Sequence, residues 1–124
     1  MKDLLLVFLG GGAGSVLRFM ISRSLSPVSG FPMGTFTVNI IGCLLIGLIL
    51  GLGQKYELFS PGTTLLLVTG FCGGFTTFST FAFENQQLLR SGDILNFSLY
   101  TLASIALGIA AVVLGLFLSG ALKS

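Results

Sequence analysis

Residues 70–81 read GFCGGFTTFSTF, and this stretch decides how the rest of the 124-residue chain is interpreted. Gly70, Gly73 and Gly74 favour an interruption of the helix, because glycine adopts non-helical backbone conformations readily. Hydroxyl side chains and phenylalanines crowd into the turns that follow. Inside a membrane, irregular backbone is tolerated only where protein buries it or where it lines a wet cavity. The stretch therefore predicts a helix break that handles a small polar solute or ion at membrane depth.

The composition around this stretch is typical of an integral membrane protein. Hydrophobic residues make up 53% of the chain, charged residues only 8%, and the mean hydropathy is +1.02. A soluble domain carries about 25% charged residues. We therefore predict a multi-pass protein of the cell membrane, inner or plasma, with the lipid bilayer as its surroundings.

Several function classes are disfavoured by the same composition. The chain has no histidine, which excludes histidine acid–base chemistry, and we expect no enzymatic activity. The formal net charge is +2 and the basic residues are scattered, so we expect no nucleic-acid partner. Cys43 and Cys72 fall within apolar stretches and are interpreted as small packing residues rather than a disulfide pair.

Four stretches are long and apolar enough to cross a bilayer, because a helical crossing needs ~20 mostly apolar residues. They cover about 4–22, 33–53, 61–89 and 94–121, and the third is long enough to include the break. Short connections with charges or helix breakers separate them. The sequence thus predicts an all-α membrane protein, with residues 1–124 forming a single transmembrane domain.

The basic residues are almost evenly divided between the two sides of this arrangement. With four crossings, both termini lie on one side of the membrane. Three basic residues lie on that side: Lys2, Lys55 and Lys123. Two or three lie on the other side: Arg23, Arg90 and the nearby Arg18. Orientation normally follows an excess of Lys and Arg in cytoplasmic loops. The near balance favours insertion in both orientations, so that two copies pair antiparallel in the membrane. A weakly biased protein with one topology is the alternative.

Asn39 is the only strongly polar side chain of the second span. A carboxamide in lipid costs free energy unless it is paired, so it must face protein or water. Its NH₂ group could donate to an anion, or its oxygen could accept a bond from a neighbouring helix. A purely structural bond between helices is the competing interpretation.

The third span places Phe78 and Phe81 on one helical face if the residues after Thr76 are helical. The edge of an aromatic ring is positive and favours a small anion, although a packing ridge is the simpler interpretation. Unwound carbonyls at the break could instead coordinate Na⁺ or another hard cation, as in transporters with broken helices. Gly73 and Thr76 are the natural carbonyl donors, and two antiparallel copies would bring four of them together. A plain kink, with its carbonyls satisfied by Ser or Thr side chains, is the alternative.

Two further candidates lie outside the second and third spans. Arg18 either extends to the membrane interface or draws anions into a vestibule. Tyr100, Ser104 and Gly108 share one face of the fourth span at four-residue spacing, where hydroxyls could donate successive hydrogen bonds to an anion. An isolated Ser in a membrane helix more often bonds to its own backbone.

Taken together, these motifs resemble the Fluc/CrcB family of fluoride channels, over essentially the whole chain. The matching pieces are residues 11–14 with Arg18, residues 34–42, which read GTFTVNIIG, and residues 70–81. The resemblance implies a fluoride-selective channel that exports F⁻ passively from the cytoplasm and so reduces its toxicity. It also implies a dual-topology antiparallel homodimer with two pores and a structural Na⁺.

The resemblance assigns a role to each candidate residue. The residues it places along the fluoride pore are Asn39, Phe78, Phe81, Ser79, Thr80, Tyr100 and Ser104. Arg18 matches a vestibule arginine, and Gly73 and Thr76 match the carbonyls that hold Na⁺ at the dimer axis. Gly108 departs from the pattern, because some members carry serine at that place.

Two other functions compete with a fluoride channel as explanations of this sequence. Small multidrug exporters are also short four-helix, dual-topology dimers, but they need an acidic residue embedded in the first helix. Here the first span has no Asp or Glu after Asp3, which stands at its end. The third candidate, a membrane assembly subunit without transport activity, leaves the polar and broken third span unexplained.

Overall fold

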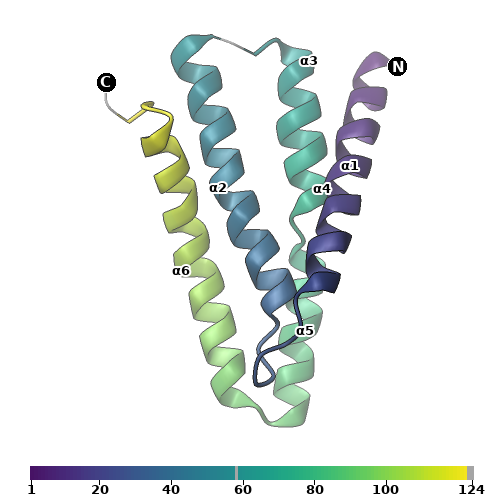
Figure 1. Ribbon diagram of the computed structural model, residues 1–124, viewed down its shortest axis with the longest axis vertical. Helices are drawn as coiled ribbons and strands as arrows, with labels where there is room; N and C mark the ends of the chain where they lie inside the picture. The colour runs from purple at the N-terminus through teal and green to yellow at the C-terminus, as the bar shows by residue number, and fades with distance from the viewer. Residues whose placement is uncertain (58, 123–124) are drawn as a thin grey trace.

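The computed structural model describes residues 1–57 and 59–122, so Lys123 lies outside the described residues. In this part of the chain, four helical segments are long and apolar enough to cross a membrane. They are α1 (Lys2–Ser24), α2 (Met33–Tyr56), a composite third span (Pro61–Ser91) and α6 (Ile94–Leu118). The four apolar helices predicted from the sequence are therefore confirmed. Figure 1 shows both termini and the α2–α3 connection at one end, with the two other connections at the opposite end.

The third span consists of several segments rather than one regular helix. It begins with α3 (Pro61–Thr64), widens into the π-helix η1 (Leu65–Cys72), and continues through α4 (Gly73–Phe75). Thr76 and Thr77 are then extended, with φ/ψ of −84°/156° and −147°/116°. Helical structure resumes in α5 (Phe78–Ser91). The predicted break is thus present, and it occupies two threonines.

The glycines that were expected to unwind the backbone are helical, and their role is different. A Cβ added at Gly74 would collide with the backbone of Gly11 on α1, and one added at Gly14 would collide with the carbonyl oxygen of Phe71. Gly10 faces the carbonyl oxygen of Leu66 in the same way. Small residues let helix backbones approach closely in lipid. Gly10, Gly14 and Gly74 therefore allow α1 to pack closely against η1 and α4. The break lies just beyond Gly74 in the chain.

Local capping explains where α5 begins and ends and where α6 begins. The Thr77 hydroxyl accepts a hydrogen bond from the Thr80 N–H at 3.3 Å, which caps the start of α5. Gly92, with a φ of 76°, ends α5 in the left-handed conformation that glycine adopts without strain. Asp93 then caps α6 by accepting from the Asn96 N–H at 3.1 Å. Asn96 also donates to the Ser29 carbonyl at 2.8 Å, which joins the two connections at this end.

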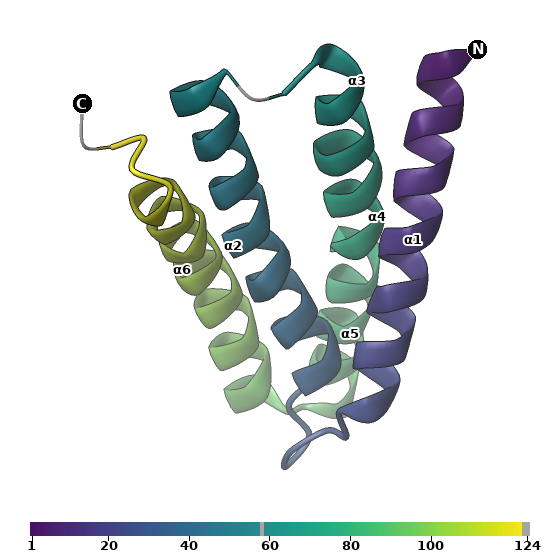
Figure 2. The same ribbon diagram turned by 45° about the horizontal axis from the view of Figure 1, so that its top comes forward.

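The helices pack as two pairs, α2 along α6 and α1 along η1 and α4, and Figure 2 shows the pairs diverging toward the end that carries the termini. The interior is small: the largest fully buried side chains are Val38, Phe75 and Tyr100. Many large apolar side chains are exposed, as expected for a surface that contacts lipid. The wedge between the pairs positions the candidate site.

Candidate functional site

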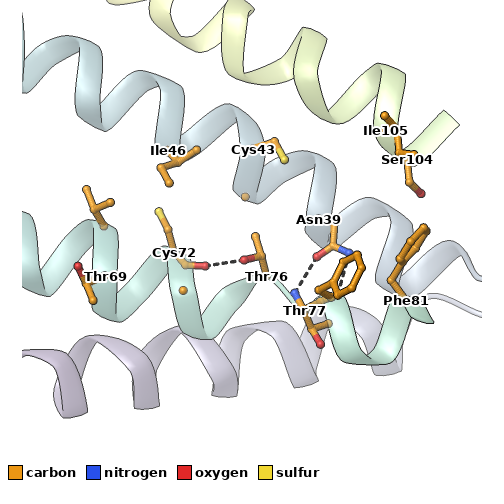
Figure 3. Close-up of a pocket in the computed structure, with 14 residues that line it drawn as sticks. Asn39, Cys43, Ile46, Thr69, Cys72, Thr76, Thr77, Phe81, Ser104 and Ile105 are labelled. Carbon is orange, nitrogen blue, oxygen red and sulfur yellow. Dashed lines mark hydrogen bonds between the residues drawn. The ribbon is translucent and has the colours of Figure 1, made fainter. Parts of the chain in front are cut away.

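The break faces an open cavity of about 420 Å³ between α2, the third span and α6 (Figure 3). The residues that line it are mostly apolar, with a few hydroxyl, thiol and amide groups: Asn39, Gly42, Cys43, Ile46, Val68, Thr69, Cys72, Gly73, Thr76, Thr77, Phe78, Phe81, Ser104 and Ile105. Among the described residues, no charged side chain lines this cavity. The cavity can therefore offer an ion neutral dipoles and ring edges, but no formal charge.

Asn39 holds the break in place from α2. Its Oδ1 accepts a hydrogen bond from the Thr77 N–H at 2.9 Å, and its Nδ2 donates to the Thr77 carbonyl oxygen at 3.2 Å. The dashed lines in Figure 3 join these two residues. A carboxamide has two N–H groups, so one remains for the cavity that Asn39 also lines. The bond between helices that the sequence left open is therefore present, and within the described residues the second amide N–H has no hydrogen-bond partner.

Two carbonyl groups at the break have lost the N–H donors that they would have in a regular helix. In an uninterrupted α-helix, the Thr77 N–H would donate to the Gly73 carbonyl, but here it donates to Asn39. The Thr80 N–H would donate to the Thr76 carbonyl, but here it donates to the Thr77 hydroxyl. The Thr76 hydroxyl bonds back to the Cys72 carbonyl at 3.0 Å. The Gly73 and Thr76 carbonyls thus lose their helical donors at the wall of the cavity.

Arg18 and Ser15 support the break from α1. Arg18 Nε donates to the Gly74 carbonyl oxygen at 3.1 Å, and the Ser15 hydroxyl donates to the same oxygen at 3.3 Å. In a continuous helix that oxygen would accept from the Phe78 N–H, which lies beyond the break. Arg18 does not line the cavity. The structure therefore places Arg18 behind the break, where it satisfies a carbonyl that the break exposes.

Phe78 and Phe81 both line the cavity, as a pair with ring centroids 5.8 Å apart. The Phe78 side chain is 80% exposed in the single chain. Phe81 packs edge-on against Tyr100, with centroids 5.0 Å apart. The two predicted rings are therefore brought together, and Phe78 has most of its surface free.

Ser104 has an unused donor at the cavity. Its Oγ is buried and has no hydrogen-bond partner within the described part of the chain, although Ser104 lines the cavity from α6. A bond from the Ser104 hydroxyl to its own helix, the usual behaviour of an isolated Ser, is not formed. A buried donor left unpaired costs free energy, so the site is suited to a ligand that accepts a hydrogen bond.

Ser79, Thr80 and Tyr100 lie near the cavity but do not line it. Ser79 Oγ lies 3.3 Å from Thr77 Oγ1, and Thr80 Oγ1 accepts from Thr77 Oγ1 at 3.1 Å. Both residues therefore belong to the cap of α5. The Tyr100 side chain is fully buried, and its hydroxyl donates to Glu84 Oε2 at 2.7 Å.

Glu84 has hydrogen-bond partners on two other helices that the sequence did not indicate. It accepts from Tyr100 and also from the Thr35 hydroxyl, at 2.8 Å. It lines a second cavity, of about 490 Å³, beside the α1–α2 connection. Its position three residues after Phe81 could have indicated a shared helical face, but the partners come from α2 and α6.

The two cysteines also have positions that the sequence did not indicate. Both are free, as predicted, and both line the cavity. Thr35, Asn39 and Cys43 recur every four residues along α2, a spacing that places them on one face and was visible in the sequence.

The comparisons with known proteins converge on one family. A family model described as "CrcB-like protein, Camphor Resistance (CrcB)" matches residues 5–116. A relative from Phocaeicola vulgatus, named fluoride-specific ion channel FluC, is 49% identical over 121 residues, covering 96% of this chain and 99% of the relative. Relatives with the same name are 48% identical in Gloeothece citriformis, over 95% of this chain and 97% of the relative, and 51% identical in Chlorobium phaeobacteroides, over 91% and 88%.

Proposed function

The chain belongs to the CrcB family, and from that premise we propose that it is a fluoride-selective ion channel through which F⁻ leaves the cytoplasm passively. The relatives named as fluoride-specific channels match almost the whole chain, so the cavity and the break lie within the shared region. Passive export down a gradient needs no energy-coupling site.

The observation that carries this function is the uncharged lining of the cavity, which is mostly apolar but includes a few neutral hydrogen-bond donors. F⁻ is small and strongly hydrated, so a narrow path must replace its water with hydrogen-bond donors. The free N–H of Asn39 and the unpartnered hydroxyl of Ser104 are uncharged donors, and the Phe78 and Phe81 rings offer positive edges. Neutral groups bind an ion weakly enough for it to leave again, which conduction requires.

The decisive experiment measures release of both halides from one preparation. Liposomes that contain the purified protein and are loaded with KF and KCl should release F⁻ and retain Cl⁻, as followed with ion-selective electrodes. Protein-free liposomes provide the leak rate. Equal release of Cl⁻ would refute selectivity, and release of neither ion would refute the channel.

Phe81→Ile should lower F⁻ efflux by about tenfold or more in that assay while the protein still assembles. Isoleucine keeps an apolar side chain against Tyr100 but removes the ring edge that faces an anion. Leu89→Ile, on the same helix at an exposed position away from the cavity, is the matched control and should conduct normally. Unchanged efflux through Phe81→Ile would remove this ring from the pathway.

We further propose that two copies assemble antiparallel in the membrane. The cavity is open in the single chain, and the 80% exposed Phe78 ring stands at it. A second copy would cover both. The near balance of basic residues between the two ends supports a pair with opposite orientations rather than a parallel pair.

Opposite orientations predict half-labelling at both ends of the molecule. Ser26 lies in the α1–α2 connection and Gln54 lies in the last turn of α2, and both are exposed. Figure 1 shows the two ends of α2 at opposite ends of the molecule, so a cysteine at either position reports the side of the membrane. In intact cells, a membrane-impermeant maleimide should label about half of the Ser26→Cys molecules and about half of the Gln54→Cys molecules. Complete labelling of one variant and none of the other would establish a single topology.

We also propose that Gly73 and Thr76 hold a structural Na⁺ through their carbonyl oxygens. Both carbonyls have lost their helical donors, and carbonyl oxygens are ligands that a hard cation accepts. An ion bound only by the folded protein raises its stability. The melting temperature in detergent should therefore be higher in NaCl than in N-methylglucamine chloride of equal concentration. The same melting temperature in both salts would contradict the site.

A further inference from the structure

We propose that the Cys43 thiol is a hydrogen-bond donor of the ion pathway and supplies the donor that α6 lacks at Gly108. The ligand it would take is a small halide ion, and the inference rests on the proposed fluoride channel.

The position of Cys43 is set by α2. It follows Asn39 by four residues, so the two side chains lie on one face of the helix, one turn apart. Both line the cavity, as Figure 3 shows. Cys43 Sγ has no hydrogen-bond partner within the described residues, although a thiol can donate weakly. The thiol therefore continues the line of available donors beyond the Asn39 amide.

The opposite wall has a matching gap. On α6, Ser104 presents a buried hydroxyl without a partner, and Gly108 is the residue one turn further on the same face. Gly108 is buried, and a Cβ added there would meet only Cys43 Sγ within 4 Å, at 3.5 Å. The thiol thus lies in van der Waals contact with the position that a side chain on residue 108 would occupy, one turn beyond Ser104.

The chemistry of a protonated thiol suits this position. It is neutral and donates only weakly, so it can help to replace the water around an anion without trapping the anion. The second cysteine of the cavity is different: Cys72 is only 2% exposed and lies on the third span. Because Cys72 also lines the cavity, it is replaced only where Cys43 must be the single reactive thiol.

The test moves the donor from one wall to the other. Cys43→Ala should lower F⁻ efflux by about fivefold, the loss expected for one neutral donor. Cys43→Ser should conduct at least as well as the unmodified protein, because a hydroxyl is the stronger donor. Cys43→Ala with Gly108→Ser should recover efflux, whereas Cys43→Ala with Gly108→Ala should not.

Equal efflux through Cys43→Ala and the unmodified protein would overturn the inference. Equal recovery of efflux by Gly108→Ala and by Gly108→Ser in the Cys43→Ala background would also overturn it. A second readout is independent of transport: F⁻ should slow the reaction of Cys43 with methyl methanethiosulfonate in Cys72→Ala protein, and Cl⁻ should not. Absence of F⁻ release from the unmodified protein would refute the channel itself. In that case, protection of Cys43 by F⁻ would still support a halide site, and lack of protection would refute it.

Discussion

Asn39→Ala should abolish F⁻ efflux and lower the free energy of unfolding by about 2–4 kcal/mol, because a buried polar group left unpaired costs about 1–3 kcal/mol. Alanine removes both bonds to Thr77, so the Thr77 N–H and carbonyl lose their partners at membrane depth. It also removes the second amide N–H of a residue that lines the cavity. Efflux from liposomes and reversible unfolding in mixed micelles measure the two effects separately.

Asn96→Ala is the matched control for this prediction. Asn96 also donates through its amide to two acceptors, the Ser29 carbonyl at 2.8 Å and Asp93 Oδ2 at 2.8 Å. These bonds lie at the connections, where water can replace them, so stability should fall by less than about 1 kcal/mol. Efflux should be unchanged. If Asn39→Ala behaved like Asn96→Ala, the carboxamide would support neither the break nor the pathway.

Gly14→Ala should prevent tight packing of α1 on the third span and destabilise the protein by about 1–3 kcal/mol or more. The added Cβ would meet the Phe71 carbonyl oxygen and, at 2.8 Å, the Phe75 nitrogen. Both are backbone atoms, which cannot rotate away as the end of a side chain can. The melting temperature and the elution profile in detergent report the loss.

Gly12→Ala provides the comparison within the same helix. A Cβ at Gly12 would meet nothing within 4 Å, and alanine favours helix by about 1 kcal/mol over glycine. Gly12→Ala should therefore be neutral or slightly stabilising. Equal damage from both substitutions would mean that glycine is needed for backbone freedom and not for close approach.

The four helices could be predicted because hydropathy and length decide whether a segment can cross a bilayer. The break in the third span could be predicted as well, since polar residues inside an apolar span need a reason. Its location could not. Gly70 and Gly74 looked like the flexible points, but they are helical because α1 packs directly against them. Only the partner helix reveals whether a glycine provides flexibility or room.

The candidate site was predicted in its chemistry more than in its contacts. A carboxamide in an apolar span marked Asn39 as facing protein or water, and four-residue spacing put Ser104 on one face with Tyr100, because both signals are local. The dual bond of Asn39 to Thr77 and the partners of Glu84 join segments far apart in the chain. The position of Arg18 behind the break is likewise a product of tertiary packing. No local pattern in the sequence specifies such pairings.

Hydrogen bonds from two helices hold the irregular turn at Thr76 and Thr77. Asn39 on α2 bonds to Thr77, and Arg18 and Ser15 on α1 bond to the preceding Gly74 carbonyl. The dipoles of the turn are therefore oriented before any solute arrives, much as an enzyme preorganises its oxyanion hole. An arriving halide has no loop to order and no side chain to recruit at this point. The barrier to its passage is then dehydration of the ion itself, rather than rearrangement of the polypeptide.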